Sequence, residues 1–306
     1  MAAGKLKPTG PAIPFTVIGG FLGSGKTTFL NHLLVQPDTP PLAVLVNDFG
    51  DIVIDQSLIK EHGGKTIALK NGCVCCSIGN DFSRALSDAI KASPRPQHII
   101  VEASGVANPA RIMDVARIST ELQAEAVIVM VDAPALSAQL EDRWVSDTVR
   151  LQLASADIFV LSKTGEIEGA ILQQRLAFLH THYPETLVAE DIDQCLDMLG
   201  GVVFQPGVDT EMRQPHAHFE TRSIVTHSEV DPARLQRWLR QRDDVYRLKG
   251  WIKVAPGDYR LVQAVGRRLN WGRADFDHDE NTTLLVIGRS SLPAAELIER
   301  SLHKQK

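Results

Sequence analysis

The chain has 306 residues, of which 44% are hydrophobic and 23% are charged, an ordinary balance for a globular protein. Its formal net charge of −5 leaves no basic stripe, which argues against a nucleic-acid partner. There is no run of about 18 apolar residues and no apolar segment near the N-terminus, so we expect a cytoplasmic protein with no membrane partner. The four cysteines are too few for a disulfide framework in a chain of this length.

Short apolar runs alternate with amphipathic stretches over the first two thirds of the chain. The apolar runs predict buried strands of a mostly parallel sheet. These runs are Phe15–Ile18, Leu42–Val46, His98–Val101, Ala126–Val131 and Ile158–Leu161. Thr27–Leu34 and Phe82–Ile90 show apolar residues three and four positions apart, which predicts helices. The alternation predicts an α/β fold, a doubly wound domain over residues 1–210 that binds ligands at the carboxyl ends of its strands.

The pattern changes after Phe204. Residues 205–214 contain proline, glycine and mixed charges without a period, and we interpret them as a linker. The rest of the chain predicts a smaller α+β domain over residues 211–306. Its expected elements are a strand at Phe219–Thr226, a helix opened by Pro232, strands at Val245–Val254, Tyr259–Val265 and Thr283–Ile287, and a closing helix from Pro293.

A phosphate-binding motif follows the first predicted strand. Residues 20–27, GFLGSGKT, match the P-loop pattern GxxxxGK[ST], and a predicted helix follows. The glycines let backbone N–H groups turn towards the phosphates, Lys26 supplies a positive charge, and the Thr27 hydroxyl is a magnesium ligand. The predicted nucleotide-binding residues here are Gly20, Gly23, Ser24, Gly25, Lys26, Thr27 and Thr28. The alternative, a glycine-rich turn that matches by chance, does not explain the strand and helix on either side.

Acidic residues follow two other predicted strands. Asp48 and Asp51 come after the second strand, and Glu102 ends the strand at His98–Val101. Phosphoryl transfer needs groups that position water and hold magnesium, so these carboxylates complete a predicted catalytic set with Lys26. Taken alone, each aspartate is better explained as an ordinary turn residue, and beside a P-loop a phosphate-side role becomes an equal alternative.

Cysteines cluster in a second motif. Cys73, Cys75 and Cys76 lie within four positions, after a glycine that allows the backbone to turn. Soft thiolates suit zinc or cuprous copper, and three ligands leave a coordination position open, as metal transfer requires. A redox pair of Cys73 and Cys76, or three buried apolar cysteines, are the alternatives. Cys195 stands apart and is interpreted as a core residue.

Taken in order, the segments GGFLGSGKTTFLNHLL, VNDFGDIVID, NGCVCC and VEASGVANP resemble the CobW-like family of P-loop GTPase metal chaperones. The later segments VYRLKGW and LLVIGR resemble the C-terminal domain of that family, so the resemblance covers the whole chain. It implies a GTPase that binds a transition metal, often zinc, and couples its delivery to GTP hydrolysis. The implied cofactors are GTP, Mg²⁺ and Zn²⁺ or another transition metal. The implied partner is a client metalloprotein that accepts the metal. A second copy of the chain, in a homodimer, is a further expected partner.

By position, the resemblance places the phosphates and magnesium at Gly23 to Thr28 and the transition metal at the three clustered cysteines. It assigns Glu102 with Ser104 and Gly105 to a second phosphate-side motif, and Asp132 to a strand-end VDA motif.

The sequence departs from the family pattern at the base-binding motif. The family has NKxD, whereas this chain has Ser162, Lys163, Thr164 and Gly165. Lys163 can still lie against a base, but Gly165 offers no carboxylate to the guanine N–H groups, and Glu166 comes one position later. The preference for GTP over ATP is therefore implied by the resemblance and not by these residues.

Two further departures concern ligands for the transition metal. Val46 and Ala68 replace glutamates that many relatives carry, which reduces the number of carboxylate ligands and leaves the metal's identity open. Some relatives carry a histidine-rich stretch, and this chain has only His216 and His218 there. We interpret them as ordinary loop residues in preference to the alternative, weak auxiliary ligands of the metal.

Two other functions compete with a metal chaperone. A nucleotide-dependent binding module would hold a structural, non-exchanging metal at the cysteines and would turn over negligibly. An ATP-using kinase on the same scaffold is the third reading, and the cysteine cluster does not support it.

Overall fold

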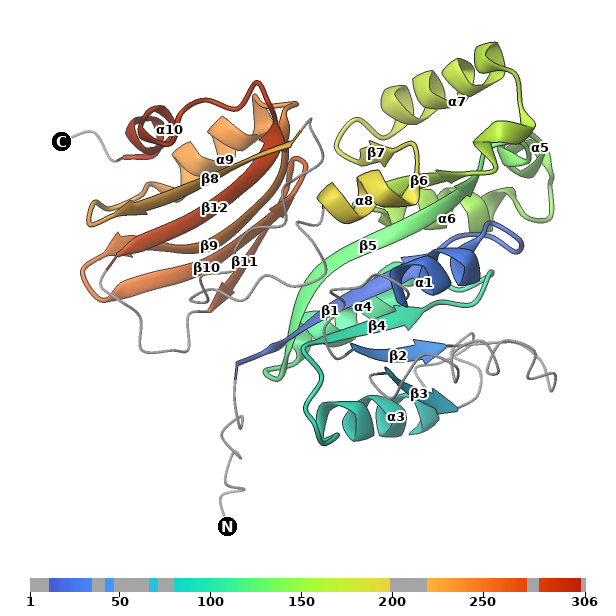
Figure 1. Cartoon of the computed structure of the whole chain (residues 1–306), viewed down its shortest axis with the longest axis horizontal. Coiled ribbons are helices and arrows are strands. Elements are labelled where there is room, and N and C mark those ends of the chain that lie inside the picture. The colour runs from blue at the N-terminus through green and yellow to red at the C-terminus, as the bar shows by residue number, and fades with distance from the viewer. Residues whose placement is uncertain are drawn as a thin grey trace. The chain divides into compact units, whose positions relative to one another are not determined.

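The computed structural model of the chain describes residues 11–34, 42–46, 66–70, 80–198, 219–273 and 281–303. The chain divides into two compact units (Figure 1). The first comprises Met1–Tyr183 with Val188–Ile192, and the second comprises Pro184–Leu187 with Asp193–Lys306. The predicted boundary at residue 210 lies outside the described residues and stays a prediction.

The first unit is built on a seven-stranded sheet with the order β3-β2-β4-β1-β5-β6-β7. Its strands are β1 (Ile13–Gly19), β2 (Leu42–Val46), β3 (Thr66–Lys70), β4 (His98–Glu102), β5 (Leu122–Asp132), β6 (Ile158–Ser162) and β7 (Leu187–Ala189). The strands pair in parallel: β1 with β4 and β5, β2 with β3 and β4, and β5 with β6. The register places Ile18 of β1 and Val46 of β2 opposite Glu102 of β4, so the three strands end at one edge.

Helices cover both faces of this sheet, so the side chains on both sides of its strands are buried. The helices of the unit are α1 (Lys26–Leu34), α3 (Asn80–Ile90), α4 (Pro109–Ile118), α5 (Leu136–Glu141), α6 (Ser146–Ser155) and α7 (Gly169–His182). One core joins Phe15 and Val17 of β1 to Ile112 and Met113 of α4. The buried face of α1, which includes Phe29, is not part of that core and packs on the opposite side (Figure 1).

The second unit contains a five-stranded antiparallel sheet with the order β11-β10-β9-β12-β8. Its strands are β8 (Phe219–Thr226), β9 (Val245–Ala255), β10 (Asp258–Val265), β11 (Arg268–Arg273) and β12 (Thr282–Arg289). The remaining helices are α8 (Ile192–Met198), α9 (Pro232–Arg240) and α10 (Ala295–Leu302). Leu235 of α9 and Ile298 of α10 are buried on Leu248 and Val286 of the sheet, which gives this unit its own core.

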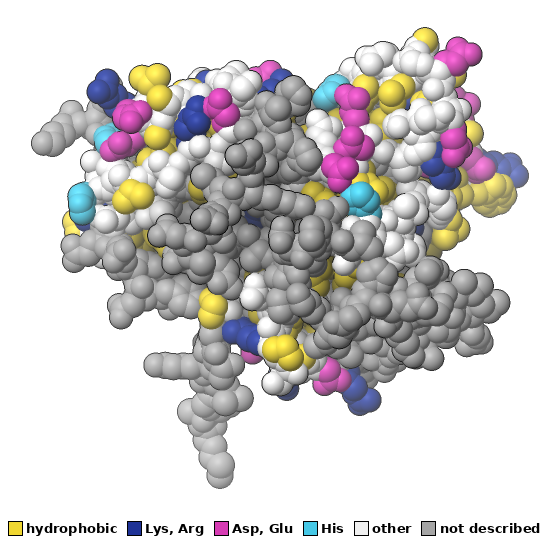
Figure 2. Space-filling model, in the orientation of Figure 1, with side chains coloured by type: hydrophobic (Ala, Val, Ile, Leu, Met, Phe, Trp, Pro, Cys, Tyr) yellow, Lys and Arg dark blue, Asp and Glu magenta, His cyan; other side chains and the backbone are white. Residues whose placement is uncertain are grey.

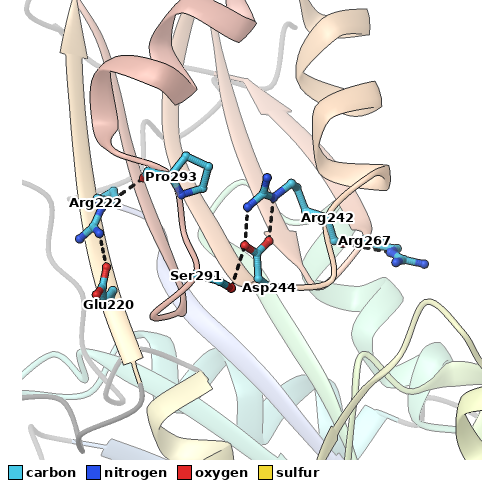
Figure 3. Close-up of polar contacts among 7 residues, drawn as sticks. All are labelled: Glu220, Arg222, Arg242, Asp244, Arg267, Ser291 and Pro293. Atoms are coloured by element: carbon cyan, nitrogen blue, oxygen red, sulfur yellow. Dashed lines mark hydrogen bonds and ion pairs between the residues drawn. The ribbon is translucent and has the colours of Figure 1, made fainter.

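A polar network lies where β9 begins and β12 ends (Figure 3). The buried Asp244 accepts two hydrogen bonds from the Arg242 guanidinium, the one from Nε at 2.7 Å, and a third from the Ser291 hydroxyl at 3.2 Å. Burial alone would raise the pKa of Asp244, but these hydrogen bonds outweigh it and the pKa is lowered. Arg267 adds a bond from its Nε to the Arg242 carbonyl at 3.1 Å. The network joins the end of α9 to the turns at one end of the sheet.

The predicted fold class is confirmed: a doubly wound, mostly parallel α/β sheet is accompanied by a smaller α+β unit. Three strands of these sheets, β3, β7 and β11, were not predicted, and the five predicted N-terminal strands all form. In the described part of the chain, none of the helices has both the length and the apolar character to cross a membrane. Figure 2 shows acidic and basic side chains interspersed over the face in view.

Candidate nucleotide-binding site

The glycine loop between β1 and α1 has the backbone that the motif requires. Gly20, Gly23 and Gly25 have φ values of 134°, 74° and 90°, a region that residues with a side chain rarely adopt. At Gly20, a Cβ atom would come within 2.5 Å of the Met130 carbonyl oxygen and 2.6 Å of the Ser24 Oγ atom. The loop therefore depends on glycine at this position for both conformation and space.

Lys26 begins α1 and lies inside the loop. Its Nζ atom donates hydrogen bonds to the carbonyl oxygens of Gly20, at 2.9 Å, and Phe21, at 3.1 Å. Only 8% of this residue is exposed, so its charge is directed into the loop and not into bulk solvent. Thr28, two residues after Lys26 on α1, is exposed.

Thr27 and Glu102 connect the loop to β4. The Thr27 hydroxyl donates to Glu102 Oε1 at 3.3 Å, and Glu102 is buried at the last position of its strand. The P-loop helix and the strand-end carboxylate, 75 residues apart in sequence, thus meet at one point. Two hard oxygen atoms at this point are the kind of ligand that Mg²⁺ prefers.

A tight turn follows Glu102 and packs on the glycine loop. The Ala107 N–H donates to the Ser104 carbonyl oxygen at 3.0 Å, which closes the turn. A Cβ atom on Gly105 would lie 2.5 Å from Leu22 Cδ2 and 2.9 Å from Leu22 N, so the turn and the loop touch through this glycine. The hydroxyl oxygens of Ser24 and Ser104 are buried and have no hydrogen-bond partner among the described residues. Buried hydroxyls are normally paired, so both are candidates to bond a ligand.

The ends of β5 and β6 form the other half of this edge. Lys163, directly after β6, has a left-handed backbone with φ 58°, and its Nζ lies 2.6 Å from Asp132 Oδ2 at the end of β5. This hydrogen bond raises the pKa of Lys163, against a smaller opposing effect of burial. Asp132 also accepts from the Ala135 N–H at 3.0 Å. A Cβ on Gly25 would lie 3.6 Å from Ser162 Cβ, so this half adjoins the P-loop.

Beyond Lys163 the edge is open. Residues Thr164–Glu166 form a single 3-10 turn in which Gly165 and Glu166 are exposed. Nothing lies within 4 Å of a Cβ atom built on Gly165. The position where the family motif has an aspartate is therefore spacious and without a carboxylate in this chain.

Several predicted site residues lie outside the described residues. They are Asp48, Asp51, Cys73, Cys75, Cys76, His216 and His218. Within the described ranges, no group of three or more histidine, cysteine or acidic residues is placed to hold a metal. Cys195 is fully buried, as the core interpretation predicted.

Sequence reasoning missed one polar residue next to this site. Gln152 of α6 is 2% exposed, and its side chain bonds the turn after Glu102. It belongs to no motif and lies 47 residues from its first bonding partner, so only its polarity on an otherwise buried helix face signals a role.

A parallel sheet, whose first strand leads through a glycine loop into a helix that carries Lys26 and Thr27, defines a P-loop nucleotide-binding domain. Residues 14–186 match the family model described as CobW/HypB/UreG, nucleotide-binding domain. Residues 219–304 match the model described as cobalamin synthesis protein cobW C-terminal domain. The chain belongs to the CobW/HypB/UreG family.

Individual relatives match along nearly their whole length. A zinc chaperone CobW from Sinorhizobium sp. is 30% identical, and the match covers 92% of this chain and 94% of the relative. The zinc chaperone YjiA of Escherichia coli is 30% identical over 93% of this chain and 96% of the relative. Among solved structures, the Zn(II)-bound YjiA GTPase of E. coli is 23% identical, covers 96% of this chain and 99% of that one, and has a TM-score of 0.45.

Proposed function

We propose that this chain is a GTP-hydrolysing metal chaperone that binds zinc at Cys73, Cys75 and Cys76 and delivers it to a client protein. The observation that carries the proposal is the meeting of Lys26, Thr27 and Glu102 at one edge of the sheet. It occurs in a chain whose relatives, matched over almost their full length, are named zinc chaperones.

The phosphate side supports nucleotide hydrolysis. Phosphoryl transfer requires positioning and neutralisation of charge more than covalent chemistry from the protein. Lys26 brings a positive charge into the loop, where it exchanges the carbonyl oxygens of Gly20 and Phe21 for phosphate oxygens. The start of α1 adds backbone N–H groups and the positive end of the helix dipole.

The oxygen pair of Thr27 and Glu102 fits magnesium. Their 3.3 Å separation and partial burial suit two ligands, direct or through water, of one hard cation. When bound, Mg²⁺ neutralises charge on the β- and γ-phosphates. The chain's own contribution is to hold these two oxygen atoms beside the phosphate loop.

The base side supports purine binding through Lys163. Asp132 fixes the Lys163 ammonium, which leaves the aliphatic part of that half-exposed side chain available to pack on a base. Guanine offers N–H donors that a carboxylate accepts, and Gly165 has none. We therefore propose GTP as the substrate on the basis of the family, with weaker discrimination against ATP than a carboxylate at position 165 would give.

Strand order supports coupling between nucleotide and zinc. Val46 at the end of β2 lies opposite both Glu102 of β4 and Lys70 of β3. Asp48 follows Val46 by two residues in the sequence and Cys73 follows Lys70 by three. The described ends of β2 and β3, which precede these predicted segments in the sequence, therefore lie at the edge where Thr27 meets Glu102. Coupling requires that zinc affinity differ between nucleotide states.

The test is the zinc affinity of the reduced chain without nucleotide, with Mg-GTP and with Mg-ATP, measured by competition with a chromophoric chelator. A variant with Cys73, Cys75 and Cys76 all changed to serine is the control for the site. We expect GTP to shift the zinc affinity at least about fivefold and the variant to lose high-affinity zinc binding. Equal zinc affinities in all three states, with zinc that does not exchange, would favour a binding module with a structural metal.

A further inference from the structure

Gln152 is a buried polar side chain that links α6 to the turn after Glu102. Its Nε2 atom donates one hydrogen bond to the Gly105 carbonyl oxygen at 3.1 Å and another to the Ala107 carbonyl oxygen at 3.0 Å. A primary amide has two N–H donors, and both are used on this one turn. The residue is 2% exposed, so water does not compete for these bonds.

The turn that Gln152 holds lies between the phosphate loop and α4. Ser104 and Ala107 close it with a backbone hydrogen bond, and Gly105 packs on Leu22 of the phosphate loop without room for a Cβ. Directly after Ala107, the Asn108 side chain caps α4 by accepting from the Ala110 N–H at 3.0 Å. The turn is therefore held by its own backbone hydrogen bond, by packing on the phosphate loop and by the start of α4. Among the described residues, Gln152 is the one side chain from another helix that donates hydrogen bonds to it.

The same turn carries a polar group without a partner. Ser104 is 5% exposed, and its hydroxyl oxygen has no hydrogen-bond partner among the described residues. It lies two residues after Glu102, which accepts a hydrogen bond from Thr27 of the P-loop helix. A buried hydroxyl in this position is suited to donate to an oxygen of the terminal phosphate.

We propose that Gln152 is a positioning residue for GTP hydrolysis, which holds the Ser104–Ala107 turn against the phosphate loop so that the turn contacts the γ-phosphate. This inference rests on the proposed function. Gln152 touches two carbonyl oxygens and not the reacting atoms, so it acts through the turn. Because the contact is to the terminal phosphate, its loss weakens triphosphate binding and turnover but not diphosphate binding.

The experiment uses the full chain with the substitution Gln152→Met, which keeps the side-chain length and removes both donors. We measure kcat and KM for GTP, and the Kd values of GDP and of a non-hydrolysable GTP analogue. We expect kcat to fall about tenfold or more, and the preference for the analogue over GDP to fall by about the same factor. The Kd of GDP stays within about twofold of the wild-type value.

Two controls separate positioning from stability. Leu153→Ala removes a buried apolar side chain from the same helix and leaves both hydrogen bonds of Gln152 to the turn in place, so it lowers the Tm but keeps the analogue preference. Gln174→Met changes an exposed glutamine on α7 and leaves all values unchanged. If Gln152→Met lost affinity for GDP and the analogue equally, or kept the wild-type kcat and preference, the inference would be overturned.

Hydrogen exchange on the wild-type chain provides a second measurement, which decides the question even if Gln152→Met does not fold. The GTP analogue should protect the amides of residues 103–108 and 149–154 together, and GDP should protect neither. Protection of the first segment without the second would contradict the link. A wild-type chain that hydrolysed no GTP would contradict the proposed function, yet the analogue preference and the exchange pattern would still judge the role of Gln152.

Discussion

The two halves of the candidate nucleotide-binding edge differ in how many of the family's binding groups they contain. At the ends of β1 and β4, the glycine loop has the required backbone, Lys26 is directed inward, and Thr27 bonds Glu102. At the ends of β5 and β6, Asp132 and Lys163 form one ion pair, and the position of Gly165 is empty of side chain. The phosphate half brings Lys26, Thr27 and Glu102 together, whereas the base half lacks a carboxylate at position 165.

This difference separates affinity from base choice. Phosphate contacts are common to every nucleoside triphosphate, so under the proposed function we expect the phosphate half to bind and hydrolyse any of them. Discrimination between guanine and adenine depends on hydrogen bonds to the base, so the incomplete half limits it. Under the proposed function we therefore expect GTP hydrolysis with a weakened preference for guanine, and each of the following changes tests one of these two expectations.

The largest effect is expected for Lys26→Ala. Its removal deletes the inward charge of the phosphate loop, and we expect kcat/KM for both GTP and ATP to fall at least about a hundredfold. Lys91→Ala, at an exposed lysine just after α3, is the matched control and keeps wild-type kinetics. Hydrolysis that survived Lys26→Ala would place the phosphates somewhere other than the P-loop.

Glu102→Gln is expected to act through magnesium. The amide keeps the shape of the side chain but loses the charge beside Thr27, so the Mg²⁺ concentration for half-maximal hydrolysis should rise roughly tenfold or more. A magnesium titration at saturating GTP measures this, with Glu141→Gln at an exposed carboxylate of α5 as control. An unchanged magnesium requirement would remove Glu102 from the cation site.

Gly165→Asp should repair the base half. No atom lies within 4 Å of the new Cβ, so the aspartate fits without distortion and can accept the guanine N–H groups. We expect the ratio of kcat/KM values for GTP over ATP to rise about tenfold. Gly169→Asp, at a second glycine with nothing within 4 Å, adds the same charge and leaves the ratio unchanged. An equal ratio in both variants would mean that base choice is made elsewhere.

Asp132→Asn should have the smallest effect. The amide oxygen still accepts from the Ala135 N–H, but the ion pair with Lys163 is lost. Lys163 is more than a third exposed, so the pair is worth about 1 kcal/mol or less, and nucleotide affinity should fall a few-fold. Isothermal titration with GTP and ATP measures the change. A loss well beyond tenfold would indicate that Asp132 contacts the nucleotide directly.

The same pair has a defined pH dependence. Because the folded-state pKa of Lys163 is raised, its stabilisation is fully present below the ordinary lysine pKa and is lost as the pH rises through the raised value. The stability difference between wild type and Asp132→Asn should therefore stay constant near neutral pH and shrink only in strongly alkaline solution.

Much of the fold followed from local patterns. The P-loop motif, with its flanking strand and helix, is contained in one short stretch, so its geometry could be predicted. The strands β3, β7 and β11 could not be predicted, because each pairs with one neighbour at a sheet edge and needs fewer apolar residues. Arg268–Arg273 has only two apolar residues, Leu269 and Trp271, alternating with polar ones, and its glycine weakens the strand pattern further.

The contacts within the site were harder to predict. The sequence indicated Lys26, Thr27 and Glu102 as separate motif members, but not that Lys163 bonds Asp132 across two neighbouring strands. Gln152 has no motif, and its two bonds reach residues 45 and 47 positions away. Such contacts arise when helices pack on a sheet, which a local pattern does not encode.

The most direct test of the account is zinc release from the loaded, reduced chain during a single turnover of GTP, followed with a chromophoric chelator. We predict that zinc release follows phosphate release in time, and that it fails with the non-hydrolysable analogue and with Lys26→Ala. Release at one rate with GTP, with the analogue and without nucleotide would contradict the claim that the P-loop edge controls the metal.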